Sequence, residues 1–128
     1  MAARINHSPR RSRLEPIELA RHIVNLVEEK KGENILLLDI SEMDAFTDYF
    51  VFCNGSSDRQ LKALQESVLE SAKKEFQAIP WSKEGSGEAE WILLDYGDVI
   101  VHLFSPEKRA FYDLEELWQE GKVLLHIQ

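Results

Sequence analysis

A glycine-serine turn is the first segment of the chain that could carry chemistry. Gly55-Ser56-Ser57 follows an apolar segment and precedes a helical pattern. Backbone amides in such a turn, ahead of a helix, can bind phosphate groups. Ser57 and Gln60 also have the spacing of a helix capping box, which needs no ligand. A structural turn is therefore the favoured interpretation, and a phosphate site is the alternative.

Phosphoryl transfer would also need two carboxylates placed to hold Mg²⁺. In nucleotidyltransferases, which use such a turn, these carboxylates lie one residue apart on a strand shortly after it. Here that interval has a helical pattern, with Glu66 and Glu70 four residues apart, while Asp95 and Asp98 flank a hairpin turn. The chain also lacks the Walker A and G-x-G-x-x-G patterns. We expect no metal, no cofactor and no enzymatic activity, and a residual nucleotidyltransferase stays an alternative.

A second group of residues combines aromatic rings with carboxylates. Its members are Glu84, Glu88, Trp91, Asp95, Tyr96 and Asp98. Trp and Tyr supply contact area at low entropic cost, and carboxylates select a cationic partner and speed its approach. One interpretation is a protein-recognition surface. The other is a core-facing Trp91 beside a polar turn, and the residue types alone favour neither.

Two single residues could serve as a nucleophile or a base. Cys53 is the only cysteine of the chain, which excludes an internal disulfide, and its apolar neighbours indicate a buried, reduced thiol in a cytoplasmic protein. His102 lies between apolar residues in a predicted strand, where a lone histidine is more often hydrogen-bonded within the fold than catalytic. Neither residue is predicted to be catalytic.

The elements that position these residues can be read from hydrophobic periodicity. Apolar spacings of three and four residues predict helices, and short apolar runs predict strands. In the first part of the chain the predictions are a helix over 16–31, a strand over 35–40, a strand over 49–53 and a helix from Ser57 to about residue 76.

The second part of the chain alternates between extended and turn-rich segments. Proline cannot donate to a strand ladder, so Ile79-Pro80-Trp81 is read as a short edge strand and residues 84–88 as a flexible loop. A hairpin with arms 89–96 and 99–104 follows. Ser105 as N-cap and Pro106 in the first turn then predict a helix through Tyr112, and Asp113 with Glu116 caps another helix. Residues 119–128 have no assignment.

The order of these elements predicts an α/β or α+β fold with a mixed sheet of about five strands flanked by helices. The chain of 128 residues is long enough for one domain. The predicted parts are a basic, flexible tail over 1–14, a folded domain over 15–118 and an extension over 119–128.

Charge narrows the range of partners. The net charge of the whole chain is -8. Residues 1–14 contain four arginines and no acidic residue, so residues 15–128 hold 11 basic and 23 acidic side chains. A body this acidic repels a phosphate backbone, which makes nucleic acid a poor candidate. A basic protein partner fits, although solubility alone also explains the charge. No apolar run approaches the length of a membrane span.

Three segments in order resemble the ribosomal silencing factor family, also called Iojap. They are residues 48–57, then Glu84-Gly85 before Trp91, then residues 95–102 with Arg109, Tyr112, Leu114-Glu115 and Leu117-Trp118. The resemblance covers about residues 15–118. It implies a fold similar to nucleotidyltransferases but without their catalytic carboxylates.

The resemblance also implies a function without catalysis. Members of the family bind the large ribosomal subunit through ribosomal protein L-fourteen and sterically block association with the small subunit, which represses translation when nutrients are short. Organelle relatives act in ribosome assembly. A homodimer of the free protein is implied as well. An acidic adaptor for another basic protein is the remaining alternative.

Several residues match the family's motif positions. Those expected to contact ribosomal protein L-fourteen are Glu84, Trp91, Asp95, Asp98 and His102. Arg109, Tyr112 and Trp118 also match, and their spacing suggests that they fix the last helices to the sheet.

Overall fold

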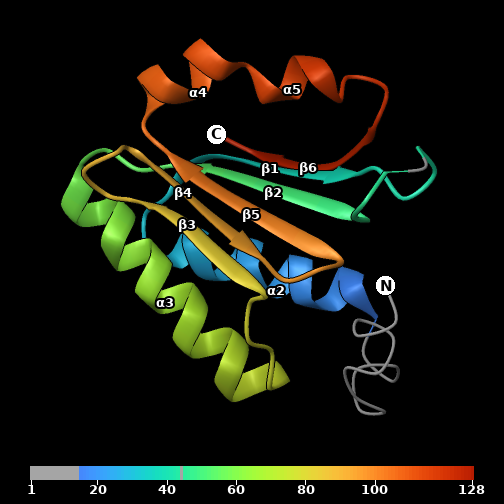
Figure 1. Cartoon of the computed structure of the whole chain (residues 1–128), viewed down its shortest axis with the longest axis horizontal. Helices are drawn as coiled ribbons and strands as arrows, with labels where there is room; N and C mark the ends of the chain where they lie inside the picture. The colour runs from blue at the N-terminus through green and yellow to red at the C-terminus, as the bar shows by residue number, and fades with distance from the viewer. Residues whose placement is uncertain (1–14, 44) are drawn as a thin grey trace.

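A mixed sheet of six strands separates two layers of helices in the computed structural model, which describes residues 15–43 and 45–128 (Figure 1). The strand order is β3-β4-β5-β2-β1-β6. Strands β2 and β5 are parallel, and every other neighbouring pair is antiparallel. The strands are β1 (Glu33–Asp39), β2 (Tyr49–Asn54), β3 (Ser82–Ser86), β4 (Trp91–Asp95), β5 (Val99–Phe104) and β6 (Lys122–Ile127). The predicted basic tail lies outside the described residues.

The helices cover the two faces of the sheet unequally. Helices α2 (Pro16–Glu29) and α3 (Asp58–Phe76) lie on one face, and the shorter α4 (Pro106–Tyr112) and α5 (Leu114–Leu117) lie on the other (Figure 1). The mixed sheet with helices on both faces confirms the predicted fold class. None of the helices in the described part of the chain is both long and apolar enough to cross a membrane.

Each face of the sheet has its own apolar core. Under α2 and α3, alternate strand residues such as Leu37, Val51 and Val101 are fully buried against both helices. Under α4 and α5, the opposite alternation brings Phe52 and Phe104 together with Trp118. The central strands β2 and β5 are apolar at most positions because both of their faces are covered, with Asn54 and His102 as polar exceptions.

Local signals place the helix starts where the sequence predicts them. The Ser57 hydroxyl accepts a 3.0 Å hydrogen bond from the amide of Gln60 at the start of α3. The Ser105 hydroxyl accepts a 3.1 Å bond from the amide of Lys108, and proline occupies the first turn of α4. Side-chain oxygens satisfy amides that have no partner within the helix.

The predicted edge strand over 79–81 is wrong. The third strand lies just beyond it, over Ser82–Ser86, and includes part of the segment read as a flexible loop. Its Ser-Lys-Glu-Gly-Ser sequence has little strand propensity, so pairing with β4 rather than local preference makes it extended. The Trp81 amide already donates a 2.6 Å bond to the Asp95 carbonyl where the pairing begins.

Two features near the end of the chain also differ from expectation. Asp113 adopts a left-handed conformation with φ 48°, and its side chain caps nothing, so the capping box predicted with Glu116 does not form. Residues 122–127 add a sixth strand, β6, which pairs antiparallel with β1. Val123 is 56% exposed and Leu125 38% exposed, which explains why β6 lacks the signal of a buried strand.

Candidate protein-recognition surface

Two rows of side chains cross the sheet on the face that α4 covers in part. Strand pairing places Glu84, Leu93 and His102 in one row, across β3, β4 and β5. Trp91 and Phe104 form a second row one step along the strands. Because side chains alternate between the faces of a strand, both rows point toward α4. Four of the five candidate residues, Glu84, Trp91, Asp95 and His102, therefore lie on one face.

A hydrogen bond to the neighbouring strand β5 orients the Trp91 ring. Its indole N–H donates to Nδ1 of His102 over 3.1 Å. Its ring centroid lies 4.5 Å from the ring centroid of Tyr112 on α4. The tryptophan is thus oriented by contacts from two elements, β5 and α4, while remaining partly exposed.

His102 lies inside the molecule rather than on the surface. Its side chain belongs to a residue that is 5% exposed and contacts the rings of Phe50, Phe52 and Phe104. Burial disfavours the charged imidazolium and lowers the pKa of His102 to about 4. The ring is therefore neutral at pH 7, and its Nδ1 can accept the bond from Trp91. The expectation of a histidine hydrogen-bonded within the fold is confirmed.

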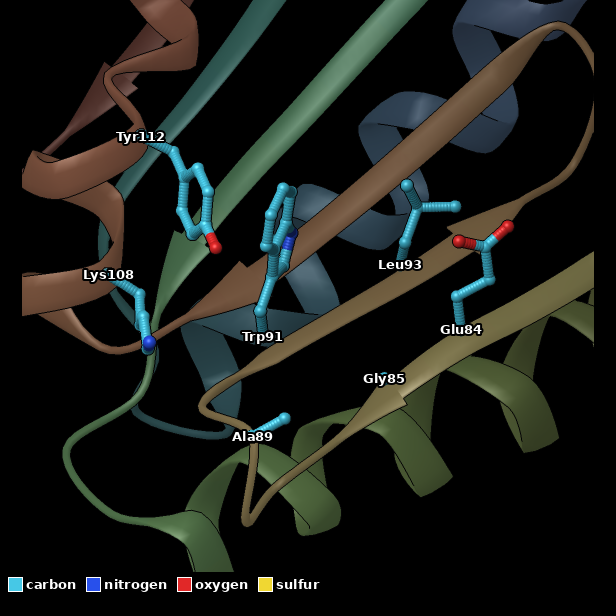
Figure 2. A pocket seen from close by; sticks show the side chains of 7 residues that line it. All are labelled: Glu84, Gly85, Ala89, Trp91, Leu93, Lys108 and Tyr112. Carbon is cyan, nitrogen blue, oxygen red and sulfur yellow. The ribbon is translucent and has the colours of Figure 1, made fainter.

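A hollow of about 420 Å³ opens beside Trp91 (Figure 2). We call it the Trp91 hollow. Its lining comes from β3, the β3–β4 turn, β4 and α4: Glu84, Gly85, Ala89, Trp91, Leu93, Lys108 and Tyr112. Trp91 lies in the middle, with Lys108 and Tyr112 toward α4 and with Glu84 and Leu93 away from it. The hollow combines aromatic and aliphatic surface with one charge of each sign.

Gly85 helps to form the hollow through its backbone. Its φ of 84° lies in the region that glycine adopts without strain, and a Cβ there would lie 1.9 Å from the carbonyl oxygen of Trp91. Only glycine allows β3 to approach β4 this closely.

The other two candidate residues lie near the far end of the hairpin. One Asp95 carboxylate oxygen accepts a 2.8 Å bond from the amide of Gly97 and so closes the β4–β5 turn. The Asp98 carbonyl accepts bonds from the amides of Asp48 and Tyr49, which joins this turn to the start of β2. Neither residue lines the Trp91 hollow. Both have a structural role that does not require a partner.

Arg109 attaches α4 to the sheet. Its guanidinium donates to the carbonyl of Asn34, to Oδ1 of Asn54 over 2.7 Å, and to both carboxylate oxygens of Glu115 at 3.0 Å each. The same group lies 5.7 and 5.6 Å from the rings of Phe52 and Phe104. This geometry matches the expectation that Arg109 fixes the last helices. Tyr112 also joins α4 to the sheet through its ring contact with Trp91, while it is 42% exposed and borders the hollow.

Gly55 and Ser56 of the glycine-serine turn form hydrogen bonds with other groups of the protein. Oε1 of Gln60 accepts bonds from the amide and hydroxyl of Ser56 over 2.6 and 2.9 Å. The Gly55 amide donates to the carbonyl of Phe104 over 3.0 Å. The Ser56 amide and hydroxyl are thus engaged by Gln60 at the start of α3, and the Gly55 amide joins β2 to β5. The geometry favours the structural interpretation of the turn.

The structure also gives no support to Cys53 as a nucleophile or to a metal site among the described residues. Cys53 is fully buried, and burial raises the pKa of its thiol to about 12, so it is protonated at neutral pH. Among residues 15–43 and 45–128, no three His, Cys, Asp or Glu side chains are grouped as they would be around a metal ion.

Sequence reasoning missed four residues that complete the hollow: Gly85, Ala89, Leu93 and Lys108. Gly85 enters the sequence predictions only as part of a loop and of the family-like segment Glu84-Gly85. Lys108 and Tyr112 lie four residues apart, so a helix beginning at Pro106 places them on one side. That spacing was visible in the sequence. The packing of α4 against the end of β4 was not.

Comparison with known proteins shows similarity along almost the whole chain. A family model described as "Ribosomal silencing factor during starvation" matches residues 13–127. The ribosomal silencing factor RsfS of Halalkalibacterium halodurans is 37% identical over 105 residues, which are 81% of this chain and 88% of that protein.

Two further relatives extend the comparison to structure and to organelles. A crystal structure of a protein from Chromobacterium violaceum has a TM-score of 0.77 at 36% identity and covers 83% of this chain and 88% of its own. A mouse protein named "Mitochondrial assembly of ribosomal large subunit protein 1" is 32% identical over 98 residues, or 75% of this chain and 43% of that protein.

Proposed function

Because the chain belongs to the ribosomal silencing factor family, we propose that it binds the large ribosomal subunit through ribosomal protein L-fourteen and sterically blocks association with the small subunit. Translation would fall when nutrients are limited. The observation that carries this proposal is the family match over residues 13–127. The name of the mouse relative, which refers to the large ribosomal subunit, supports the choice of subunit.

The surface charge is consistent with a basic ribosomal partner. Residues 15–128 hold 11 basic and 23 acidic side chains, so long-range attraction would concentrate the protein near a cationic surface. Steric exclusion needs only a folded body held in the right place. The proposal therefore includes no catalysis and no cofactor, and it places the protein in the cytoplasm.

We place the contact surface around the Trp91 hollow. Trp91 and Glu84 would touch the partner directly, since both are accessible on this face. His102 would act through Trp91, because its own ring is buried behind the indole. Asp95 and Asp98 would contribute charge from the neighbouring turn.

Sedimentation with separated ribosomal subunits tests the function. The purified protein should co-migrate with large subunits and not with small subunits. When small subunits are then added, fewer complete ribosomes should form than without the protein. No co-migration at moderate salt would contradict the proposal. Binding to an unrelated basic protein but not to large subunits would favour the adaptor alternative.

Substitutions test the surface. Trp91→Ala should weaken large-subunit binding at least tenfold, whereas Trp81→Ala, outside the hollow, should not. The double change Asp95→Lys and Asp98→Lys should weaken binding more than Glu66→Lys with Glu70→Lys, which alters net charge equally on exposed positions of α3. If the Trp91→Ala variant and the Asp95→Lys, Asp98→Lys variant both fold and bind large subunits as well as the parent protein, this surface is not the contact surface.

A further inference from the structure

We propose that the Trp91 hollow binds a single arginine side chain of the partner, with its guanidinium between Glu84 and the ring of Trp91 and its aliphatic part across the apolar surface of the hollow. The partner's identity rests on the proposed function. The chemistry of the site rests on the lining alone, so it can be tested without ribosomes.

The floor of the hollow suits a long side chain with a flat, charged end. Trp91 and Leu93 alternate to the same face of β4, and Tyr112 extends the aromatic surface from α4. A guanidinium group stacks on aromatic faces, and its methylene stem packs on apolar surface. The volume of about 420 Å³ is large enough for one such side chain with its adjoining backbone.

The charge at the Glu84 end of the hollow is uncompensated within the described part of the chain. Among residues 15–43 and 45–128, the carboxylate of Glu84 has no hydrogen-bond or ion-pair partner. The neighbouring Lys83 is paired with Leu94 and so points to the opposite face, toward α3. An incoming cation would therefore supply a partner for this carboxylate.

The other charged groups near the hollow define its polarity. Glu90 is already held by the hydroxyl of Ser105 over 2.8 Å, at the start of α4. Lys108 lies on the α4 side of Trp91, across the hollow from Glu84 (Figure 2). A cation is favoured near Glu84 and disfavoured near Lys108. The arginine side chain is therefore expected to bind with its charged end toward Glu84 and away from Lys108.

Arginine fits this lining better than lysine. A guanidinium is planar, so it can stack on Trp91 while donating two parallel hydrogen bonds to one carboxylate. A lysine ammonium is a strongly hydrated point charge and gains less from the rings. The small residues Gly85 and Ala89 line the hollow beside Glu84.

Nuclear magnetic resonance of the full chain labelled with ¹⁵N tests the proposal. The ligand is the blocked tripeptide acetyl-Gly-Arg-Gly-amide, and the comparison peptide carries citrulline, which has nearly the same shape without the charge. The arginine peptide should shift the indole N–H signal of Trp91 saturably. The indole signals of Trp81 and Trp118, which do not line the hollow, should not move.

The expected differences are specific. Affinity should be at least fivefold weaker for the citrulline peptide and at least threefold weaker for a lysine peptide. Glu84→Gln should reduce arginine affinity at least fivefold, whereas Lys108→Gln should leave it equal or raise it. Because both positions are at the surface, unchanged spectra elsewhere will show that the variants fold. Equal binding of arginine and citrulline, an unaffected Glu84→Gln variant, or the lack of a saturable Trp91 shift would overturn the proposal.

Sedimentation of the same variants separates this inference from the proposed function. Arginine binding without large-subunit binding would contradict the function and leave the site intact. If Glu84→Gln leaves large-subunit binding unchanged and the arginine and citrulline peptides bind equally well, the function would be supported and the arginine site overturned.

Discussion

The indole N–H of Trp91 and Nδ1 of His102 are 3.1 Å apart, and this bond joins the surface of the sheet to its interior. Trp91 lies on β4 and His102 on β5 in adjacent rows. The histidine is neutral because it is buried, and only a ring whose Nδ1 is unprotonated can accept the bond. The orientation of a partly exposed aromatic residue therefore depends on the protonation of a buried one.

The protonation of His102 should make the protein less stable in acid. The pKa of His102 is about 4 in the folded protein and 6.5 without the fold, so the unfolded chain binds the additional proton between these values. The free energy of unfolding should therefore decrease as pH falls from 6.5 to 4, by about 3 kcal/mol from this group. Urea unfolding across this range should show a steeper loss for the parent protein than for His102→Gln. Identical pH dependence would contradict this assignment.

Replacement of Arg109 by lysine should destabilise the protein by about 2–4 kcal/mol. Lysine keeps the charge but loses the paired bonds to Glu115 and cannot reach the same set of acceptors on β1 and β2. Thermal unfolding measures the loss. The exposed Lys74→Arg in α3 is the matched control and should change little. A midpoint equal to that of the parent would show that α4 is held mainly by other contacts.

Gly85→Ala should disturb the pairing of β3 with β4. Its Cβ would lie 1.9 Å from the Trp91 carbonyl oxygen at a φ of 84°, so the strand must shift at a cost of about 2 kcal/mol or more. Hydrogen exchange should become faster in β3 and β4 while α2 stays protected. Glu88→Ala, in the exposed turn, serves as the control and should leave both strands protected.

Removal of residues 119–128 should destabilise the sheet and promote aggregation. The truncation removes β6 and leaves the edge of β1 unpaired, and its Leu37 and Leu38 are buried in the two cores. Light scattering and the thermal midpoint measure both effects. Val123→Ser should be nearly neutral, because that side chain is 56% exposed. A truncated protein as stable as the full chain would show that β6 is dispensable.

Loss of Gln60 should affect stability and not create nucleotide binding. Gln60→Ala removes the acceptor of the Ser56 amide and hydroxyl and should cost about 1–2 kcal/mol. Calorimetry with ATP and Mg²⁺ should detect no binding by the parent or by the variant. Tight nucleotide binding by either protein would revive the nucleotidyltransferase alternative. Lys62→Ala, exposed on the same helix, is the control for stability.

The sequence by itself determined the elements with strong local signals. Continuous apolar runs predicted β1 and β2, three-to-four spacing predicted α2 and α3, and serine before a helical turn predicted the starts of α3 and α4. These signals depend on neighbours in the chain. The motif order from residue 48 to Trp118 also predicted the family that the comparisons show.

Only the tertiary structure decided the features that depend on pairing between distant segments. The sequences of β3 and β6 are polar or half exposed, so they become strands because β4 and β1 offer hydrogen-bond partners. The sequence predicted that His102 is hydrogen-bonded within the fold, but its partner, the indole of Trp91, depends on the pairing of β4 with β5. The Trp91 hollow unites β3, β4 and α4, because the sheet and the packing of α4 bring them together and no spacing along the chain could specify this.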